Sequence, residues 1–159
     1  MLTKVLQNNW PMYLILLILA IFGMCTAGHT QQVNISIIEQ IESGGNPSAY
    51  NRYSGAVGLC QITPAVIMDY ARGITIDQNG EFPLYMSDMT NGWANSHVAN
   101  WYINIKIPKY LKYYGIRDTL VHRLWAYNAG IKAVREHRIP YETKLYIEKY
   151  YGLIRKGNK

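Results

Sequence analysis

The chain has 159 residues, of which 49% are hydrophobic and 16% are charged, and its formal net charge at pH 7 is +6. This composition excludes a disordered chain, and the length suffices for one domain with a hydrophobic core but not for two. A basic balance favours an acidic partner, such as nucleic acid, anionic lipid or an anionic cell-wall polymer. Between Lys106 and Lys159 the basic residues form no arginine-rich run and no zinc-finger spacing, so we expect no nucleic-acid partner.

Residues 1–28 are predicted to be a signal peptide or an N-terminal membrane anchor. They contain no acidic residue, and residues 12–25 form an apolar run that has the length of a signal-peptide core and is short for a membrane-spanning helix. The small residues Thr26, Ala27 and Gly28 permit cleavage. Without cleavage, the apolar run would anchor the protein in the inner membrane. In both cases we expect the rest of the chain to be exported to the periplasm.

The cysteines are Cys25 and Cys60. Cys25 lies in the leader, so a processed chain would keep one thiol and could form no internal disulfide. The two cysteines and four histidines show no metal-ligand spacing. We therefore predict neither a metal nor another cofactor.

A first helix is predicted over about residues 32–43, because apolar residues recur there at helical spacing. Gly44 and Gly45 end this helix and place Glu42 in its last turn. The helix dipole disfavours a negative charge at that end. The position is therefore poor for a structural carboxylate and suitable for one that must stay protonated.

Thr63 as N-cap and Pro64 at the first helical position predict a second helix, which Gly73 would end. The segments before and after this helix, residues 46–60 and 73–90, are rich in Gly, Asn, Ser and Asp. Both are predicted to be loops.

A longer helix is predicted from Asn91, with a break or kink at Pro108. Asp118 or Thr119 caps the next helix, and Pro140 introduces the last one.

No stretch of the chain alternates as a strand would. We therefore predict an all-α domain of about six helices around one core, over about residues 30–151. A basic tail, residues 152–159, follows this domain.

Four short motifs are candidates for chemistry: Glu42-Ser43, Gly58-Leu59-Cys60-Gln61-Ile62-Thr63-Pro64, Ala126-Tyr127-Asn128-Ala129-Gly130 and Glu142-Thr143-Lys144-Leu145-Tyr146. Taken singly, each has an ordinary explanation as a helix end, a turn or a first helical turn. In this order they resemble the catalytic domain of the soluble lytic transglycosylases, glycoside hydrolase family 23, over about residues 30–151. That family is related to goose-type lysozyme.

The resemblance implies a lysozyme-like fold with a groove for the glycan strands of peptidoglycan. Glu42 would protonate the glycosidic oxygen between N-acetylmuramic acid and N-acetylglucosamine. It would then act as a base while the muramic acid 6-hydroxyl closes a 1,6-anhydro ring. The residues implied to line the groove or to surround the acid are Ser43, Gln61, Tyr127, Asn128, Glu142 and Tyr146. A single acid of raised pKa suffices for this reaction, whereas ordinary glycosidases pair two carboxylates.

The sequence departs from the family pattern at Cys60, where most relatives carry Met. The thiol side chain of Cys is smaller than the thioether side chain of Met and is more easily oxidised. We therefore expect altered packing of the groove and an activity that responds to oxidation. Asn51 lies near a loop position where relatives often carry Ser.

Two other functions stay open. A hydrolytic goose-type lysozyme would need a second carboxylate, for which the candidates are Glu39, Asp69, Asp77, Glu81 and Asp88. A non-catalytic wall-binding or assembly protein would use the same groove without cleavage. By analogy with small exported relatives, a secretion or conjugation apparatus is the expected partner, and we expect a monomer.

Overall fold

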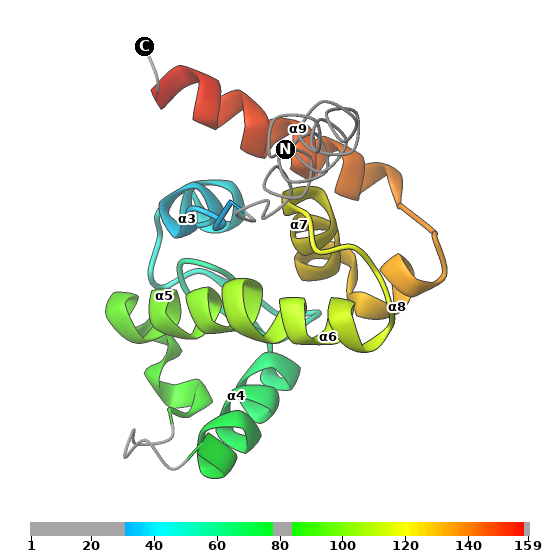
Figure 1. The fold of residues 1–159 in the computed structure, drawn as a ribbon. Coiled ribbons are helices and arrows are strands. Elements are labelled where there is room, and N and C mark those ends of the chain that lie inside the picture. The colour runs from blue at the N-terminus through cyan, green and yellow to red at the C-terminus, as the bar shows by residue number, and fades with distance from the viewer. Residues whose placement is uncertain (1–30, 78–83, 158–159) are drawn as a thin grey trace, which may run out of the picture. The chain divides into compact units, whose positions relative to one another are not determined.

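The structure, a computed structural model, describes residues 31–77 and 84–157, apart from the side chains of residues 75–77. The predicted leader, Cys25 and Glu81 lie outside the described residues. Most of the described chain is helical, which confirms the all-α prediction. The helices are α3 (Ile35–Ser43), α4 (Pro64–Asp77), η2 (a 3-10 helix, Met86–Thr90), α5 (Gly92–Trp101), η3 (a π-helix, Tyr102–Lys106), α6 (Ile107–Tyr113), α7 (Leu120–Ala129), α8 (Ile131–Arg135) and α9 (Tyr141–Gly157) (Figure 1).

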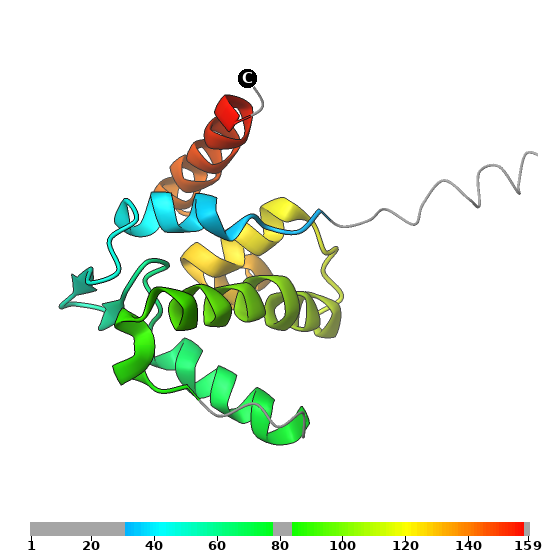
Figure 2. The same ribbon diagram turned by 90° about the vertical axis from the view of Figure 1, so that its left-hand side faces the viewer.

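The segments α5, η3 and α6 form one continuous helical run across the middle of the domain. Helix α4 lies on one side of this run, and α3 and α7 lie on the other side (Figure 1, Figure 2). Helix α9 packs against both α3 and α7. The run is buried along one face, where its largest fully enclosed apolar side chains are Val98, Ile103, Ile107 and Leu111.

A break or kink was predicted at Pro108. The helix does not break there, because a π-helical turn precedes the proline. The N–H of Ile107 donates to the carbonyl of Tyr102, five residues back. Helix α6 then begins, with Pro108 in its first turn. The wider turn thus lets the run continue through a proline.

Helix α3 ends at Gly44 as predicted, since Gly44 has a left-handed φ of 65°. It begins at Ile35, later than predicted, because the Asn34 side chain caps it by accepting the N–H of Ser36 at 3.0 Å. The Asn34 N–H itself donates to the Tyr150 hydroxyl of α9 at 2.7 Å. The start of α3 is therefore fastened to the last helix.

Helix α4 begins at Pro64 as predicted but continues through Gly73 to Asp77, so the predicted stop at Gly73 is wrong. A Cβ atom at Gly73 would lie 2.5 Å from the Trp101 ring. The glycine therefore allows α4 to approach Trp101 closely, and this packing outweighs its low helix propensity.

The segment predicted as a loop, residues 46–60, contains a small antiparallel hairpin. Strand β1 (Tyr50–Asn51) pairs with β2 (Ala56–Val57), and the pairing joins Tyr50 to Val57 and Asn51 to Ala56. Two-residue strands are too short to show the alternation by which a strand is recognised in a sequence.

Asn95 of α5 ties the segment after β2 to the rest of the domain. Its side chain is fully buried, and its Nδ2 donates to the carbonyls of Val57 at 2.8 Å and Met89 at 2.9 Å. Its Oδ1 accepts the N–H of Cys60 at 2.8 Å. Both the nitrogen and the oxygen of this buried side-chain amide thus have hydrogen-bond partners. These bonds stabilise the segment and fix its position.

Of the two predicted N-cap residues, Thr119 is the one that caps α7. Its side chain accepts the N–H of His122 at 3.1 Å. The other candidate, Asp118, instead accepts two hydrogen bonds from Arg123, each of 2.7 Å. Arg123 is buried, so this two-pronged ion pair satisfies a charge that would otherwise be costly to enclose.

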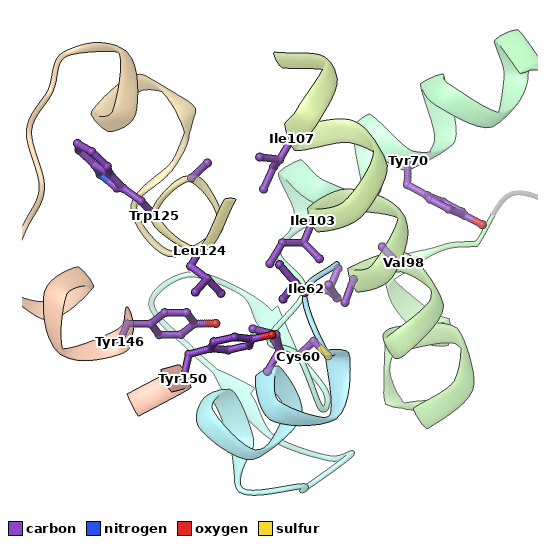
Figure 3. Close-up of a cluster of buried hydrophobic side chains, with 14 of the residues drawn as sticks. Cys60, Ile62, Tyr70, Val98, Ile103, Ile107, Leu124, Trp125, Tyr146 and Tyr150 are labelled. Atoms are coloured by element: carbon purple, nitrogen blue, oxygen red, sulfur yellow. The ribbon is translucent and has the colours of Figure 1, made fainter. Parts of the chain in front are cut away.

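Cys60 lies in the core with an exposed fraction of 0%, in the hydrophobic cluster that also contains Ile62, Tyr146 and Tyr150 (Figure 3). Burial raises the pKa of its thiol above the ordinary value, and the charges of Glu39 and Glu42 raise it further. Since the thiolate is the species that is oxidised, this setting argues against the expected response to oxidation.

Replacing Gly58 by Ala should unfold the segment that Asn95 holds. Gly58 has a φ of 81°, and an added Cβ would come within 2.2 Å of both the Asn95 side-chain nitrogen and the Met89 carbonyl. We expect a loss of about 3 kcal/mol of unfolding free energy, measured by urea denaturation. The matched control is Gly152→Ala in α9, where a Cβ meets no atom within 4 Å. It should stabilise by up to about 1 kcal/mol, and equal effects of the two changes would contradict the assignment.

The Cys60 thiol should resist alkylation in the native protein. Iodoacetamide should leave the Cys60 peptide unmodified without denaturant and modify it fully in guanidinium chloride, as read by peptide mass mapping. Full modification of the native protein within minutes would show that the thiol is accessible.

Candidate functional site

Glu42 lies in the last turn of α3, where the sequence placed it. The Gly45 N–H folds back to the Glu39 carbonyl at 3.2 Å and closes the helix end behind it. Burial raises the pKa of the Glu42 carboxyl above its ordinary value of 4.5, and the Tyr146 hydroxyl opposes this rise to a smaller degree. Burial therefore favours the protonated acid.

Tyr146 of α9 faces Glu42 and has an exposed fraction of 7%. Burial and the Glu42 charge together raise the pKa of its phenol, so it stays neutral. The Tyr146 hydroxyl lies close enough to Glu42 for a hydrogen bond between them to contribute to the pKa shift of each group. Tyr146 is thus a neutral hydrogen-bond donor beside the acid.

A first cavity of about 350 Å³ opens on one side of Glu42. It lies among the hairpin, α4, the π-helical turn and α7. Its lining residues are Glu42, Asn51, Ser54, Ala56, Gln61, Ile62, Thr63, Ala65, Val66, Tyr102, Ala126, Tyr127, Asn128 and Gly130. Among the described residues of this lining, Glu42 carries the one carboxyl group, and the other polar side chains are neutral amides and hydroxyls.

Gln61 is held in the first cavity by a strained backbone and two hydrogen bonds. Its φ of 51° lies in the left-handed region that side-chain-bearing residues rarely adopt. Its Nε2 donates to the carbonyls of Gly58 at 3.1 Å and Ala49 at 3.4 Å. Both bonds use the nitrogen, so the side-chain oxygen is left as an acceptor for a ligand.

Tyr127 and Asn128, at the end of α7, form the opposite wall. The Tyr127 hydroxyl donates to the Cys60 carbonyl at 2.7 Å, and burial raises the pKa of this phenol well above its ordinary value. The Asn128 side-chain oxygen accepts from the Thr143 hydroxyl at 2.7 Å. Thr143 is buried on α9, and we did not predict it as a site residue although it stands in the Glu-Thr motif.

A second cavity of about 290 Å³ also has Glu42 in its lining. Its lining residues are Ile41, Glu42, Glu142, Leu145, Tyr146 and Lys149. Glu42 is thus shared by the two cavities and lies where they meet. Lys149 was not predicted as a site residue, although its helical spacing from Glu142 and Tyr146 places all three on one face of α9.

Ser43 lines neither cavity. Its hydroxyl donates to the Glu39 carbonyl at 3.2 Å and accepts the Asn46 N–H at 3.1 Å. It therefore secures the turn behind Glu42 and does not face the space where a ligand would bind. Asn51 does line the first cavity, together with Ser54, which the sequence analysis did not single out.

The candidate second carboxylates with described side chains lie outside both cavities. Glu39 accepts from the Ser96 hydroxyl at 2.6 Å, and Asp69 accepts from the Tyr110 hydroxyl at 2.8 Å. Asp88 accepts the Tyr85 N–H at 2.8 Å. The side chain of Asp77 is not described. The carboxylate that shares a cavity with Glu42 is instead Glu142, which is exposed.

Among the residues that the structure describes, no group of His, Cys, Asp and Glu side chains is arranged to hold a metal ion. Within the same residues, no helix combines the length and the apolar character needed to cross a bilayer.

The family comparison covers every lining residue of both cavities except Lys149. A model of the family described as "Transglycosylase SLT domain" matches residues 20–148, which include Glu42 and every predicted site residue. No curated protein and no solved structure matches the chain. The match carries with it peptidoglycan as the bound polymer and a lytic-transglycosylase type of cleavage. With most of its length matched, the chain belongs to the transglycosylase SLT domain family.

Proposed function

We propose that the protein is an exported lytic transglycosylase that cleaves the β-1,4 bond between N-acetylmuramic acid and N-acetylglucosamine and leaves a 1,6-anhydromuramic acid end. The observation that carries this proposal is the position of Glu42. It is a partly buried carboxyl of raised pKa that lines two cavities, so a polymer that fills both passes over it.

Glu42 acts first as the acid. Its raised pKa keeps it protonated closer to neutral pH, which a general acid requires. It gives its proton to the glycosidic oxygen as the bond from that oxygen to the anomeric carbon breaks. The N-acetylglucosamine then leaves as an alcohol, and the oxygen of the 2-acetamido group stabilises the positive anomeric carbon.

Glu42 acts next as the base. The carboxylate takes the proton of the muramic acid 6-hydroxyl, whose oxygen bonds to the anomeric carbon and closes the anhydro ring. The acid is thereby regenerated and no water is consumed. A second carboxylate is unnecessary because the substrate supplies both the stabilising group and the nucleophile.

Tyr146 supports Glu42 or the intermediate. Its hydroxyl can donate to the Glu42 carboxylate once the proton has left, or to the intermediate that forms beside it. A hydrogen bond that strengthens when its acceptor becomes charged stabilises the transition state more than the resting state.

Gln61, Tyr127 and Asn128 hold the sugar in the first cavity. The Gln61 oxygen is free to accept from an acetamido N–H. The Asn128 side-chain oxygen already accepts a hydrogen bond from the Thr143 hydroxyl. The amide nitrogen of Asn128 therefore remains available as a donor to the sugar. Neutral amide and hydroxyl groups of this kind suit an uncharged N-acetylated sugar.

One observation favours hydrolysis as a second candidate. Glu142 lines the second cavity with Glu42, and a carboxylate there can activate a water, as inverting glycosidases require. The products distinguish the two reactions, because hydrolysis leaves reducing ends and the proposed reaction leaves anhydro ends.

Export to the periplasm through residues 1–28, whether by cleavage or by anchoring, is part of the proposal and rests on the sequence. The proposed role as a partner of a secretion or conjugation apparatus rests on analogy with small exported relatives. Cell fractionation of the full chain, with and without residues 1–28, tests the export.

Glu42→Gln should abolish release of anhydromuropeptides from purified cell wall. The amide keeps the shape of the side chain but cannot transfer the proton, so we expect a loss of about 10³-fold or more, read by mass spectrometry of the released products. The matched control is Glu39→Gln, one turn earlier on α3 and outside both cavities. If Glu42→Gln releases these products as fast as the wild type, Glu42 is not the acid.

The same substitution should stabilise the protein at neutral pH. The folded-state pKa of Glu42 is raised above 4.5, so its stabilising contribution is complete below that pH and is lost as pH rises through the raised value. Glutamine cannot ionise and avoids this loss. The difference in unfolding free energy between Glu42→Gln and wild type should therefore be more favourable at about pH 7 than at about pH 4, by urea denaturation. If the difference in unfolding free energy between the variant and the wild type is the same at both pH values, ionisation of Glu42 does not destabilise the folded protein.

A further inference from the structure

The two cavities that meet at Glu42 differ in chemistry. Apart from Glu42, the polar lining of the first cavity consists of uncharged amides and hydroxyls. The second cavity combines the charged side chains of Glu142 and Lys149 with the apolar side chains of Ile41 and Leu145. A polymer that fills both cavities therefore meets neutral protein groups in the first cavity and charged protein groups in the second.

Glu142 and Lys149 lie on one face of α9, two helical turns apart, with Leu145 between them. Two turns of helix span about 11 Å. Within the described part of the chain, neither side chain forms an ion pair, whereas Glu136 on α8's C-terminal side pairs with both Lys132 and Arg138. The cavity thus offers one free negative and one free positive charge at a defined spacing.

The sugar rings of peptidoglycan carry no charge, but each muramic acid bears a short stem peptide through its lactyl group. Such peptides carry carboxylates and, where a diamino acid is present, a free ammonium. An extended peptide rises about 3.4 Å per residue, so about three residues span the distance between the two charges. The muramic acid whose bond is cleaved lies against Glu42, which both cavities share.

We propose that the second cavity binds the stem peptide of the muramic acid at the cleaved bond. In this proposal, which rests on the proposed function, Lys149 pairs with a stem carboxylate and Glu142 with the stem ammonium. Leu145 packs against the aliphatic part of the peptide between them. Lys149 and Glu142 then determine the preference for stem-bearing over bare glycan.

The expected effect is modest because both charges are exposed. An exposed ion pair changes binding by up to about fivefold and is screened by salt. The preference for stem-bearing substrate should therefore weaken as the salt concentration rises, while cleavage of bare strands should depend less on salt.

The test uses the full chain on two substrates made from the same cell wall, namely soluble glycan strands that keep their stems and strands freed of stems by an amidase. The readout is the ratio of kcat/KM for stem-bearing to stem-free strands. Lys149→Met should lower this ratio by up to about fivefold. The matched control is Lys144→Met, an exposed lysine on the same helix that lines neither cavity, and it should keep the wild-type ratio.

A second arm tests Glu142. Acetylating the stem amine should lower the wild-type ratio and should have no further effect on Glu142→Gln, because the carboxylate and the ammonium are then already unpaired. Unfolding midpoints equal to that of the wild type show that the variants are folded.

The outcomes separate the two proposals. An unchanged ratio in Lys149→Met, with wild type cleaving both substrates, overturns the stem-binding assignment and leaves the transglycosylase intact. Failure of the wild type to cleave either substrate overturns the proposed function itself.

Discussion

The three hydrogen bonds of the buried Asn95 side chain are the constraint on which the site depends. They hold the backbone of residues 57–60 against α5 and η2, and they leave no room for a side chain at Gly58. The Cys60 carbonyl is thereby placed to accept the Tyr127 hydroxyl, and Gln61 follows directly in the chain. One satisfied buried amide therefore positions both walls of the first cavity.

Helix α9 supplies the second constraint, because it contacts both α3 and α7 through different residues. Tyr150 accepts the N–H of Asn34 at the start of α3, and Thr143 donates to Asn128 at the end of α7. Tyr146, between them on the same helix, lies against Glu42. The groups that would act together thus come from three separated segments that a single helix aligns. The cost is a partly buried acid of raised pKa beside a buried phenol, a local loss of stability of the kind that functional sites often carry.

Local sequence rules predicted the end of α3 and the cap of α7, missed the Asn34 cap at the start of α3, and failed where packing decides. The left-handed Gly44 and the cap at Thr119 are local features, and both were predicted. Gly73 and Pro108 were predicted to interrupt helices, but a close approach to Trp101 and a π-helical turn accommodate them. Both accommodations depend on residues on a neighbouring turn or helix, which propensity alone does not describe.

The sequence by itself determined the helical class, the order of the motifs and, through them, the family to which the chain belongs. Tertiary structure alone decided which motif residues meet: it brings Gln61, Asn128 and Tyr146 to Glu42, turns Ser43 away, and adds Lys149. It also decided that burial, with no paired carboxylate in the first cavity, raises the pKa of Glu42. The physical reason is that a motif records residue types along one segment, whereas burial and electrostatic coupling arise between segments that are distant in the chain.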